Sequence, residues 1–429
     1  MDPDRTSVFY GVKKHLRKKH SEDLVTQFFR IGGYSGLAAA IMFVLHVVMA
    51  RLLGPARYSE YGVYVAILFT FFIAATSVQL VITRFVSYHR TRFQNEQINY
   101  LVTKSLKWMF IVGAGLFAVT VVFADPISTF FGVEEVLATA LLGFVLWFVI
   151  MQPVFEGAFR GVDDMQSLGR MRLVEAVVRF VLVVSAVLAG FSVAGAVFGL
   201  GAGTFVALAF SYKHIYRIQR LKAVAPNLRS VRRYAVPVVL TMSSFALLLN
   251  LDIILVKYYF PPAEAGVFVA ASFLAKIPVF VSIVFAGVLF PRVTRLFVNG
   301  KPSGSLLKHA LVVITFLMTV FTFASFFFAQ PLLALIFGSE YVLGPVVGFY
   351  VFGMSALAIS IVLIVYLLAI NKDRCAFALP LFVLGFILLL VLFNSSTTQV
   401  ILSVMLLMTS LAAYAVYSAR EVLEFDYFL

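Results

Sequence analysis

Long apolar runs alternate with short polar segments along this chain. A bilayer hydrocarbon core about 30 Å thick requires about 20 apolar residues per helical crossing, and the runs have that length. Their pattern therefore predicts an all-α integral membrane protein with twelve transmembrane helices. The expected helices cover residues 31–53, 61–83, 105–124, 136–159, 173–190, 193–212, 234–258, 265–290, 309–328, 343–370, 377–394 and 398–419.

The composition supports this class and excludes others. The 429 residues are 62% hydrophobic and 13% charged, whereas a soluble domain carries about 25% charged residues. The only cysteine, Cys375, allows neither an intramolecular disulfide nor a cysteine-based metal centre. Residues 1–30 are polar and basic and lack the apolar core of a signal peptide, so we expect a basic cytoplasmic N-terminal segment.

The distribution of positive charge predicts the orientation. Most of the 34 lysines and arginines fall in one set of alternate loops, and the opposite set contains only Arg51, Arg57 and Lys257. By the positive-inside rule both termini are then cytoplasmic, as in a multi-pass protein of the plasma membrane. The net charge of +14 is expected to attract anionic lipids at the cytoplasmic face. A nucleic-acid partner is not expected, because no basic soluble domain with interleaved aromatic residues is present.

Two segments recur at about half the chain length. The stretch at 50–66, ARLLGPARYSEYGVYVA, matches VKYYFPPAEAGVFVA at 256–270, and FADPISTFFGVEE at 123–135 matches FAQPLLALIFGSE at 328–340. The matched pairs are Arg51 and Lys257, Pro55 and Pro261, Glu60 and Glu264, Gly62 and Gly266, Phe131 and Phe337, and Gly132 and Gly338.

A duplication of an even number of helices gives parallel repeats. We therefore expect two parallel six-helix repeats around a central cavity, which opens to each side of the membrane in turn. The N-terminal lobe would cover 31–212, a basic cytoplasmic linker 213–233, and the C-terminal lobe 234–429 with a short cytoplasmic tail.

Three motifs carry a resemblance to a known family. They are LLGPARYSEYGVYVAILF at 52–69, LDIILVKYYFPPAEAGVFVAASF at 251–273 and VLFPRVTRLF at 288–297. With them the chain resembles the polysaccharide transporters, or oligosaccharide flippases, of the superfamily that also contains multidrug extruders and the lipid II flippase. The resemblance implies two six-helix lobes around a cavity that moves a polyprenyl-pyrophosphate-linked glycan to the outer leaflet. The sequence departs from the family at Phe260-Pro261-Pro262, where Gly-Pro is commoner.

Ionisable residues inside the predicted helices are the candidate site residues, because a charge at bilayer depth is costly unless it is paired or hydrated. Lys276 would lie about 16 Å from the outer surface. As a lone ammonium it could bind a pyrophosphate or sugar phosphate, and alternatively it could form a structural ion pair with Asp252. Asp252, with Asn250 nearby, and His46 at the equivalent place in the other lobe are expected to face the cavity near its outer end.

The fifth predicted helix carries Arg172, Glu175 and Arg179 on one face. Glu175 and Arg179 have the i, i+4 spacing of a salt bridge, and the alternative is that Arg179 contacts the substrate headgroup while Glu175 positions it. Arg30, at the cytoplasmic start of the first helix, would either meet an anionic lipid substrate or extend to lipid headgroups. Asp252, His46 and Glu175 are candidates for a coupling proton, since histidine titrates near neutrality.

We expect neither an enzyme nor a cofactor. The chain has no GxxxxGK[ST] motif for a nucleotide, and the membrane potential, at about 2.3 kcal/mol per charge per 100 mV, already favours export of an anion. A proton or sodium gradient is the alternative source of energy for transport. Glycosyltransferases or a polymerase of the same pathway are the expected protein partners.

Two other functions are open. A cation-coupled multidrug extruder would need clustered acids, and the N-terminal helices offer only Glu156 and Glu175. A membrane glycosyltransferase or polysaccharide polymerase would need paired catalytic groups in its external loops. Those loops are short, and Glu134 and Glu135 are their only adjacent acids.

Overall fold

The structure is a computed structural model. It describes the backbone of residues 4–425 apart from 220–222, 299–301, 371 and 373. Side chains are described between Gly33 and Arg420, apart from these same residues and from 217–219, 288, 290, 291, 295 and 298. The described residues contain helices and no strand. The helices are α1 (Asp4–Arg90), α2 (Asn95–Val122), α3 (Ala124–Phe131), α4 (Val136–Gly161), α5 (Met165–Ala186), the π-helix η1 (Val187–Phe191), α6 (Ser192–Gln219), α7 (Leu228–Tyr259), α8 (Pro262–Ala275), α9 (Ile277–Val298), α10 (Gly304–Phe337), α11 (Val346–Ala369), α12 (Arg374–Leu392) and α13 (Thr397–Phe425).

Ten helical stretches among the described residues are long and apolar enough to cross a membrane. Two of them, Gly33–Arg90 with 58 residues and Met165–Tyr216 with 52, are longer than the roughly 20 residues of one crossing. The first is broken at Gly54 (φ 69°, ψ 169°) and the second at Gly190 (φ 92°). Both glycines adopt positive φ, which side chains disfavour. The protein is thus an all-helical, multi-pass membrane protein, and twelve crossings remain a prediction.

The helices differ from the predicted runs in three places. The run at 265–290 is divided at Lys276, which ends α8 before α9 begins. Pro278 explains the break, because proline lacks the N–H of a continuous helix and its ring clashes with the preceding turn. Helix α1 begins at Asp4, inside the basic N-terminal segment that precedes the first predicted helix. The expected linker is mostly helical as well, since α6 reaches Gln219 and α7 begins at Leu228.

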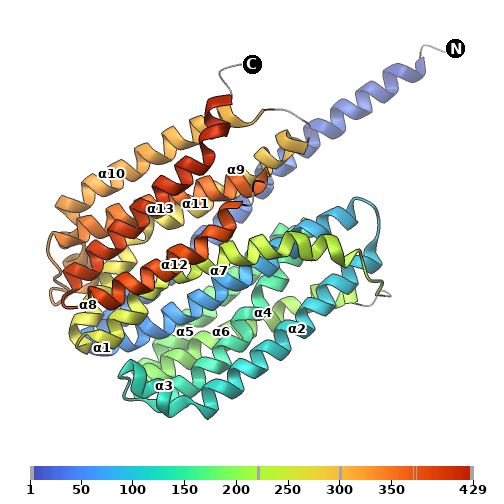
Figure 1. The fold of residues 1–429 in the computed structure, drawn as a ribbon. Coiled ribbons are helices and arrows are strands. Elements are labelled where there is room, and N and C mark those ends of the chain that lie inside the picture. Colours follow the sequence, from blue (N-terminus) through green and yellow to red (C-terminus); the bar gives the residue numbers. More distant parts are fainter. Residues whose placement is uncertain (1–3, 220–222, 299–301, 371, 373, 426–429) are drawn as a thin grey trace.

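The helices gather into two bundles (Figure 1). In the first bundle, α1 to α6, the helix α4 packs on α1, α2 and α6; in the second, α7 to α13, the helix α11 packs on α9, α10 and α13. Helix α1 runs along α7 and also contacts α8, which joins the bundles. We call the end of the molecule near Gly54, α3 and the start of α8 the Gly54 end. The opposite end, where α1 ends and α7 begins, is the linker end (Figure 1).

Candidate functional site

Two basic side chains connect the bundles at the Gly54 end. Arg51, in α1, donates from Nε to the carbonyl of Ile336 (2.9 Å) and from Nη2 to the carbonyl of Leu335 (2.6 Å) in α10. Lys257, in α7, donates from Nζ to the carbonyl of Gly132, which follows α3 (3.4 Å). Carbonyls at a helix C-terminus lack helical partners and carry partial negative charge, so cations are favoured there.

These contacts are reciprocal. Arg51 and Lys257 occupy matching positions of the sequence repeat, and Gly132 matches Gly338, next to the carbonyls that Arg51 binds. Each bundle therefore extends one cation to the same kind of helix end in the other bundle. We call these two contacts the reciprocal joint.

Two matched glycines bring the bundles close together at the same end. A Cβ on Gly62 would lie 2.5 Å from Cγ1 and 3.2 Å from Cβ of Val269 in α8. A Cβ on Gly266 would overlap the carbonyl oxygen of Pro55 in α1. Helices α1 and α8 thus cross at backbone distance, which only small residues permit.

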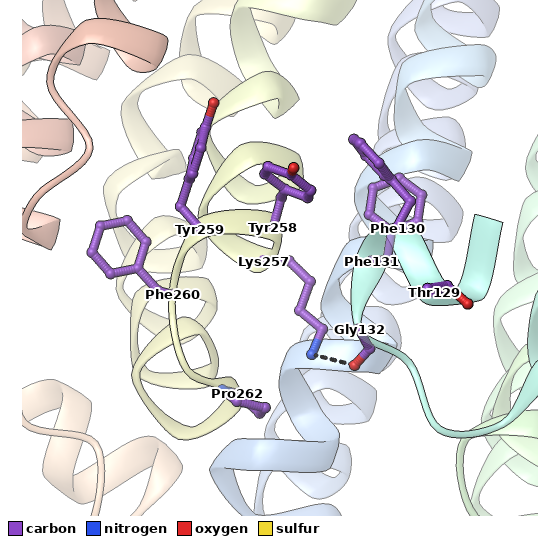
Figure 2. Close-up of a pocket in the computed structure, with 9 residues that line it drawn as sticks. All are labelled: Thr129, Phe130, Phe131, Gly132, Lys257, Tyr258, Tyr259, Phe260 and Pro262. Carbon is purple, nitrogen blue, oxygen red and sulfur yellow. Dashed lines mark hydrogen bonds between the residues drawn. The ribbon is translucent and has the colours of Figure 1, made fainter. Parts of the chain in front are cut away.

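An aromatic pocket of about 490 Å³ lies beside the reciprocal joint. Figure 2 shows Lys257 reaching past the rings toward Gly132, with Phe130 from α3 on one side and Tyr258 from α7 on the other. The rings of Phe130 and Tyr258 are stacked with centroids 4.5 Å apart. Both bundles line this pocket. Of its aromatic residues, the sequence marks only Phe131, as a repeat position, and Phe260, in the Phe-Pro-Pro departure, and neither predicts a pocket.

Asp252 is the centre of a polar cluster in the second bundle. Its fully buried carboxylate accepts hydrogen bonds from Lys276 Nζ (3.3 Å), from the backbone N–H of Ile253 (2.8 Å) and from the Tyr350 hydroxyl. The Tyr350 hydroxyl also lies 2.8 Å from Ser272 Oγ. Lys276 is itself buried and forms an ion pair with Asp252. This is the ion pair that the sequence left open as the alternative to a lone ammonium, and it meets the need of a buried charge for a partner.

The ion pair has the geometry of the structural alternative for Lys276, and a contact between Lys276 and a substrate stays a prediction. Tyr350, on α11, was not predicted as part of this cluster. A tyrosine in an otherwise apolar helix carries too little signal in the sequence, because its hydroxyl is equally often directed to water or lipid headgroups.

His46 lies between the two bundles. Its ring centroid is 4.4 Å from that of Phe273 in α8 and 5.8 Å from that of Tyr61. The buried hydroxyls of Tyr58 and Tyr61 have no hydrogen-bond partner among the described residues. The Nδ2 group of Asn250 donates to Ala246 O within its own helix (3.0 Å), so this donor is already used inside α7.

Paired charges also occupy the interior of the first bundle. Glu175 pairs with Arg179 (2.8 Å), as one alternative predicted, and accepts a hydrogen bond from Gln152 Nε2 (2.7 Å). The carboxylate of Glu156 receives two hydrogen bonds from Arg172, at 2.6 and 3.1 Å. Gln152 also donates to Glu156 (3.3 Å), which connects the two ion pairs.

Arg179 is further bound inside its bundle. It donates to Thr204 Oγ1 (2.6 Å) and Leu200 O (3.2 Å) of α6, and Gly203 packs against its side chain. A contact between Arg179 and a headgroup stays a prediction. Arg30 belongs to α1, but its side chain lies outside the described residues. No group of three His, Cys, Asp or Glu side chains that could bind a metal occurs in the described part of the chain.

Comparisons with known proteins agree with this architecture. The sequence model of the polysaccharide biosynthesis protein family matches residues 25–297. An inward-facing multidrug resistance MATE family transporter of the MOP superfamily superposes with a TM-score of 0.72 at 12% identity, covering 91% of this chain and 96% of its own. The lipid II flippase MurJ, in an inward closed conformation, gives 0.71 at 13% identity, with 91% and 87% covered.

A MOP superfamily transporter from Pyrococcus furiosus gives a TM-score of 0.63 at 14% identity, with 92% and 95% covered. No curated protein matches the sequence significantly. At these identities the solved structures establish the fold alone, and the family model, which spans most of the chain, establishes the family. The chain has the fold of MOP superfamily transporters and belongs to the polysaccharide biosynthesis protein family.

Proposed function

We propose that the protein is a flippase that moves a polyprenyl-pyrophosphate-linked oligosaccharide from the inner to the outer leaflet of the cell membrane, for surface polysaccharide biosynthesis. The observation that carries this proposal is the reciprocal joint, because it closes one end of the interface between two bundles with contacts that can break without unfolding either bundle. Membership in the polysaccharide biosynthesis protein family supports a glycan as the cargo.

The topology that accompanies this function has twelve crossings in two parallel six-helix repeats, with both termini cytoplasmic. In that orientation the linker end faces the cytoplasm and the Gly54 end faces outward. The reciprocal joint is then the closed outer gate, and the two bundles rock about their shared contact along α1 and α7. This is alternating access by rocking of two repeats that are related by an axis along the membrane normal.

The charges of the first bundle favour an anionic cargo over a cationic one. Glu156 and Glu175 are each paired with arginine, and three arginines, Arg160, Arg172 and Arg179, accompany these two acids. A cation extruder would need carboxylates available to its substrate, whereas here the cluster has an excess of positive charge. The membrane potential then assists the outward movement of a pyrophosphate by about 2.3 kcal/mol per charge per 100 mV.

Lys276 is the residue that we propose for contact with the pyrophosphate in the second bundle. Its ammonium lies 3.3 Å from the Asp252 carboxylate. A phosphate that reaches Lys276 can take the place of this carboxylate as its anionic partner. A proton that enters the Asp252 carboxylate as Lys276 leaves it would provide coupling, with His46 or Glu175 as the alternative proton carriers.

The test is a flipping assay in proteoliposomes. A fluorescent polyprenyl-pyrophosphate glycan is placed in both leaflets, and a membrane-impermeant quencher measures how fast the inner pool becomes accessible. Protein-containing vesicles should expose the inner pool much faster than protein-free vesicles, and a potential that favours anion movement toward the quencher should increase the rate. Extrusion of a cationic dye without any glycan flipping would contradict the proposal and favour the multidrug extruder.

A further inference from the structure

A second pocket, of about 620 Å³, lies at the linker end, at the opposite end of the molecule from the reciprocal joint. Its volume is within the range of about 300 to 1,000 Å³ that small-molecule sites occupy. Side chains from the end of α1, the following turn, residues 225–227 and the start of α7 line it. Both bundles therefore contribute, and so does the basic linker 213–233 that we expect at the cytoplasmic face.

The pocket is cationic. Arg84, Arg92 and His89 line it, and the other lining residues are aromatic, amide, hydroxyl or apolar, with no carboxylate among them. Neither arginine forms an ion pair with a described residue. The nearby acid Glu96 is exposed in the first turn of α2 and is not part of the lining.

Both guanidinium groups are held in place by aromatic rings. Arg84 lies 4.1 Å over the ring of Tyr234 in α7, and Arg92 lies 4.1 Å over the ring of Tyr88 in α1. A guanidinium stacked by its face keeps its N–H donors at the edge, where they can bind the oxygens of a phosphate in bidentate fashion. The stacking thus orients both arginines, and Arg84 also hydrogen-bonds to Tyr234, which leaves its other N–H groups for a ligand.

The remaining lining supplies further donors. The buried His89 is fixed by a hydrogen bond between Nδ1 and Gln94 Oε1 (2.7 Å), and the lining also includes Asn227, which caps α7, and Ser230 in its first turn. Next to Arg92, Phe93 is 89% exposed at the tip of the turn. An exposed phenylalanine beside arginine suits the boundary between lipid headgroups and acyl chains, where apolar side chains insert and basic ones meet the headgroups.

We propose that this pocket binds the phosphate of an anionic membrane lipid headgroup, and that the bound headgroup connects the two bundles at the linker end. Phosphate is the shared chemistry, and the exposed Phe93 favours a lipid over free phosphate as its source. Binding here does not depend on glycan transport, because the pocket is separate from Lys276 and from the reciprocal joint.

The experiment uses the full chain in a neutral detergent and measures its thermal unfolding midpoint. Short-chain phosphatidylglycerol, phosphatidylcholine with the same chains, and sodium phosphate are titrated in parallel, since a ligand that binds the folded state raises the midpoint. Arg84→Gln and Arg92→Gln remove the guanidinium groups from exposed positions. Arg90→Gln is the matched control, because Arg90 is exposed in the same helix end and does not line the pocket.

We expect phosphatidylglycerol to raise the midpoint of the wild type and of Arg90→Gln at the same concentration. Each of the other two variants should require about tenfold more, the loss of one charge-assisted hydrogen-bond pair. An equal shift with phosphatidylcholine, an equal loss in Arg90→Gln, or no shift in the wild type would overturn the proposal. An equal shift with sodium phosphate would overturn the lipid as the source.

Discussion

The buried pair of Lys276 and Asp252 allows a quantitative test of stability and function together. Lys276→Met leaves the Asp252 carboxylate fully buried with only the Ile253 amide and the Tyr350 hydroxyl as donors. Removing one partner of a buried ion pair costs about 3 to 5 kcal/mol. Asp252→Asn leaves a buried ammonium and should cost about the same. Replacing both charges should cost much less than the sum, because no unpaired charge remains.

The assay is a double-mutant cycle on the purified protein in detergent, with unfolding followed by denaturant and by heat. The double variant should be more stable than either single variant, so the interaction energy between the two charges should exceed about 3 kcal/mol. The same three variants are then reconstituted for the flipping assay. If Lys276 contacts the pyrophosphate, the double variant folds but does not flip the glycan.

Two results would refute this reasoning. A double variant as unstable as the sum of the single variants would show that the two charges do not stabilise each other. A stable double variant that flips glycan at the wild-type rate would leave Lys276 a purely structural role.

Three further substitutions test the gate and the first bundle. Arg51→Gln or Lys257→Gln removes one half of the reciprocal joint and should favour the state open at the Gly54 end by about 1 kcal/mol. Faster labelling of a cysteine engineered at the Gly54 end would detect this shift. Equal labelling in the wild type and the variant would contradict the gate. Gly266→Ala should separate α1 from α8, because the new methyl group overlaps a backbone carbonyl, whereas Gly115→Ala, with open space around it, should leave the same labelling unchanged. Glu156→Gln should lower the free energy of unfolding by about 3 kcal/mol, because it leaves Arg172 without its carboxylate partner. An unchanged melting curve would show that the pair contributes nothing to stability.

The sequence predicts the membrane class and most helices, because hydropathy over about 20 residues is a strong signal. The break at Gly54 falls between two predicted runs for the same reason. The break at Lys276 was missed, since 265–290 is apolar throughout and Pro278 alone does not decide whether a helix bends or stops.

For the site, spacing on one helix was enough to predict the pair of Glu175 and Arg179. The pairing of Glu156 with Arg172 joins two helices, and no periodicity along the chain specifies which helices meet. The repeat did identify Arg51 and Lys257 as equivalent, but their partners are backbone carbonyls, which every residue carries. A contact to a backbone carbonyl does not depend on the residue type of the partner. The reciprocal joint could therefore be identified only from the structure.

The central claim is that the Gly54 end must open for transport, and a reversible cross-link tests it directly. Gly62→Cys with Val269→Cys, made in a Cys375→Ser chain, places two Cβ atoms close to the distance of 3.5 to 4.5 Å that disulfides span. Oxidation should stop glycan flipping and reduction should restore it, while the Val269→Cys single variant should respond to neither. Flipping at an unchanged rate by the fully cross-linked protein would contradict the account.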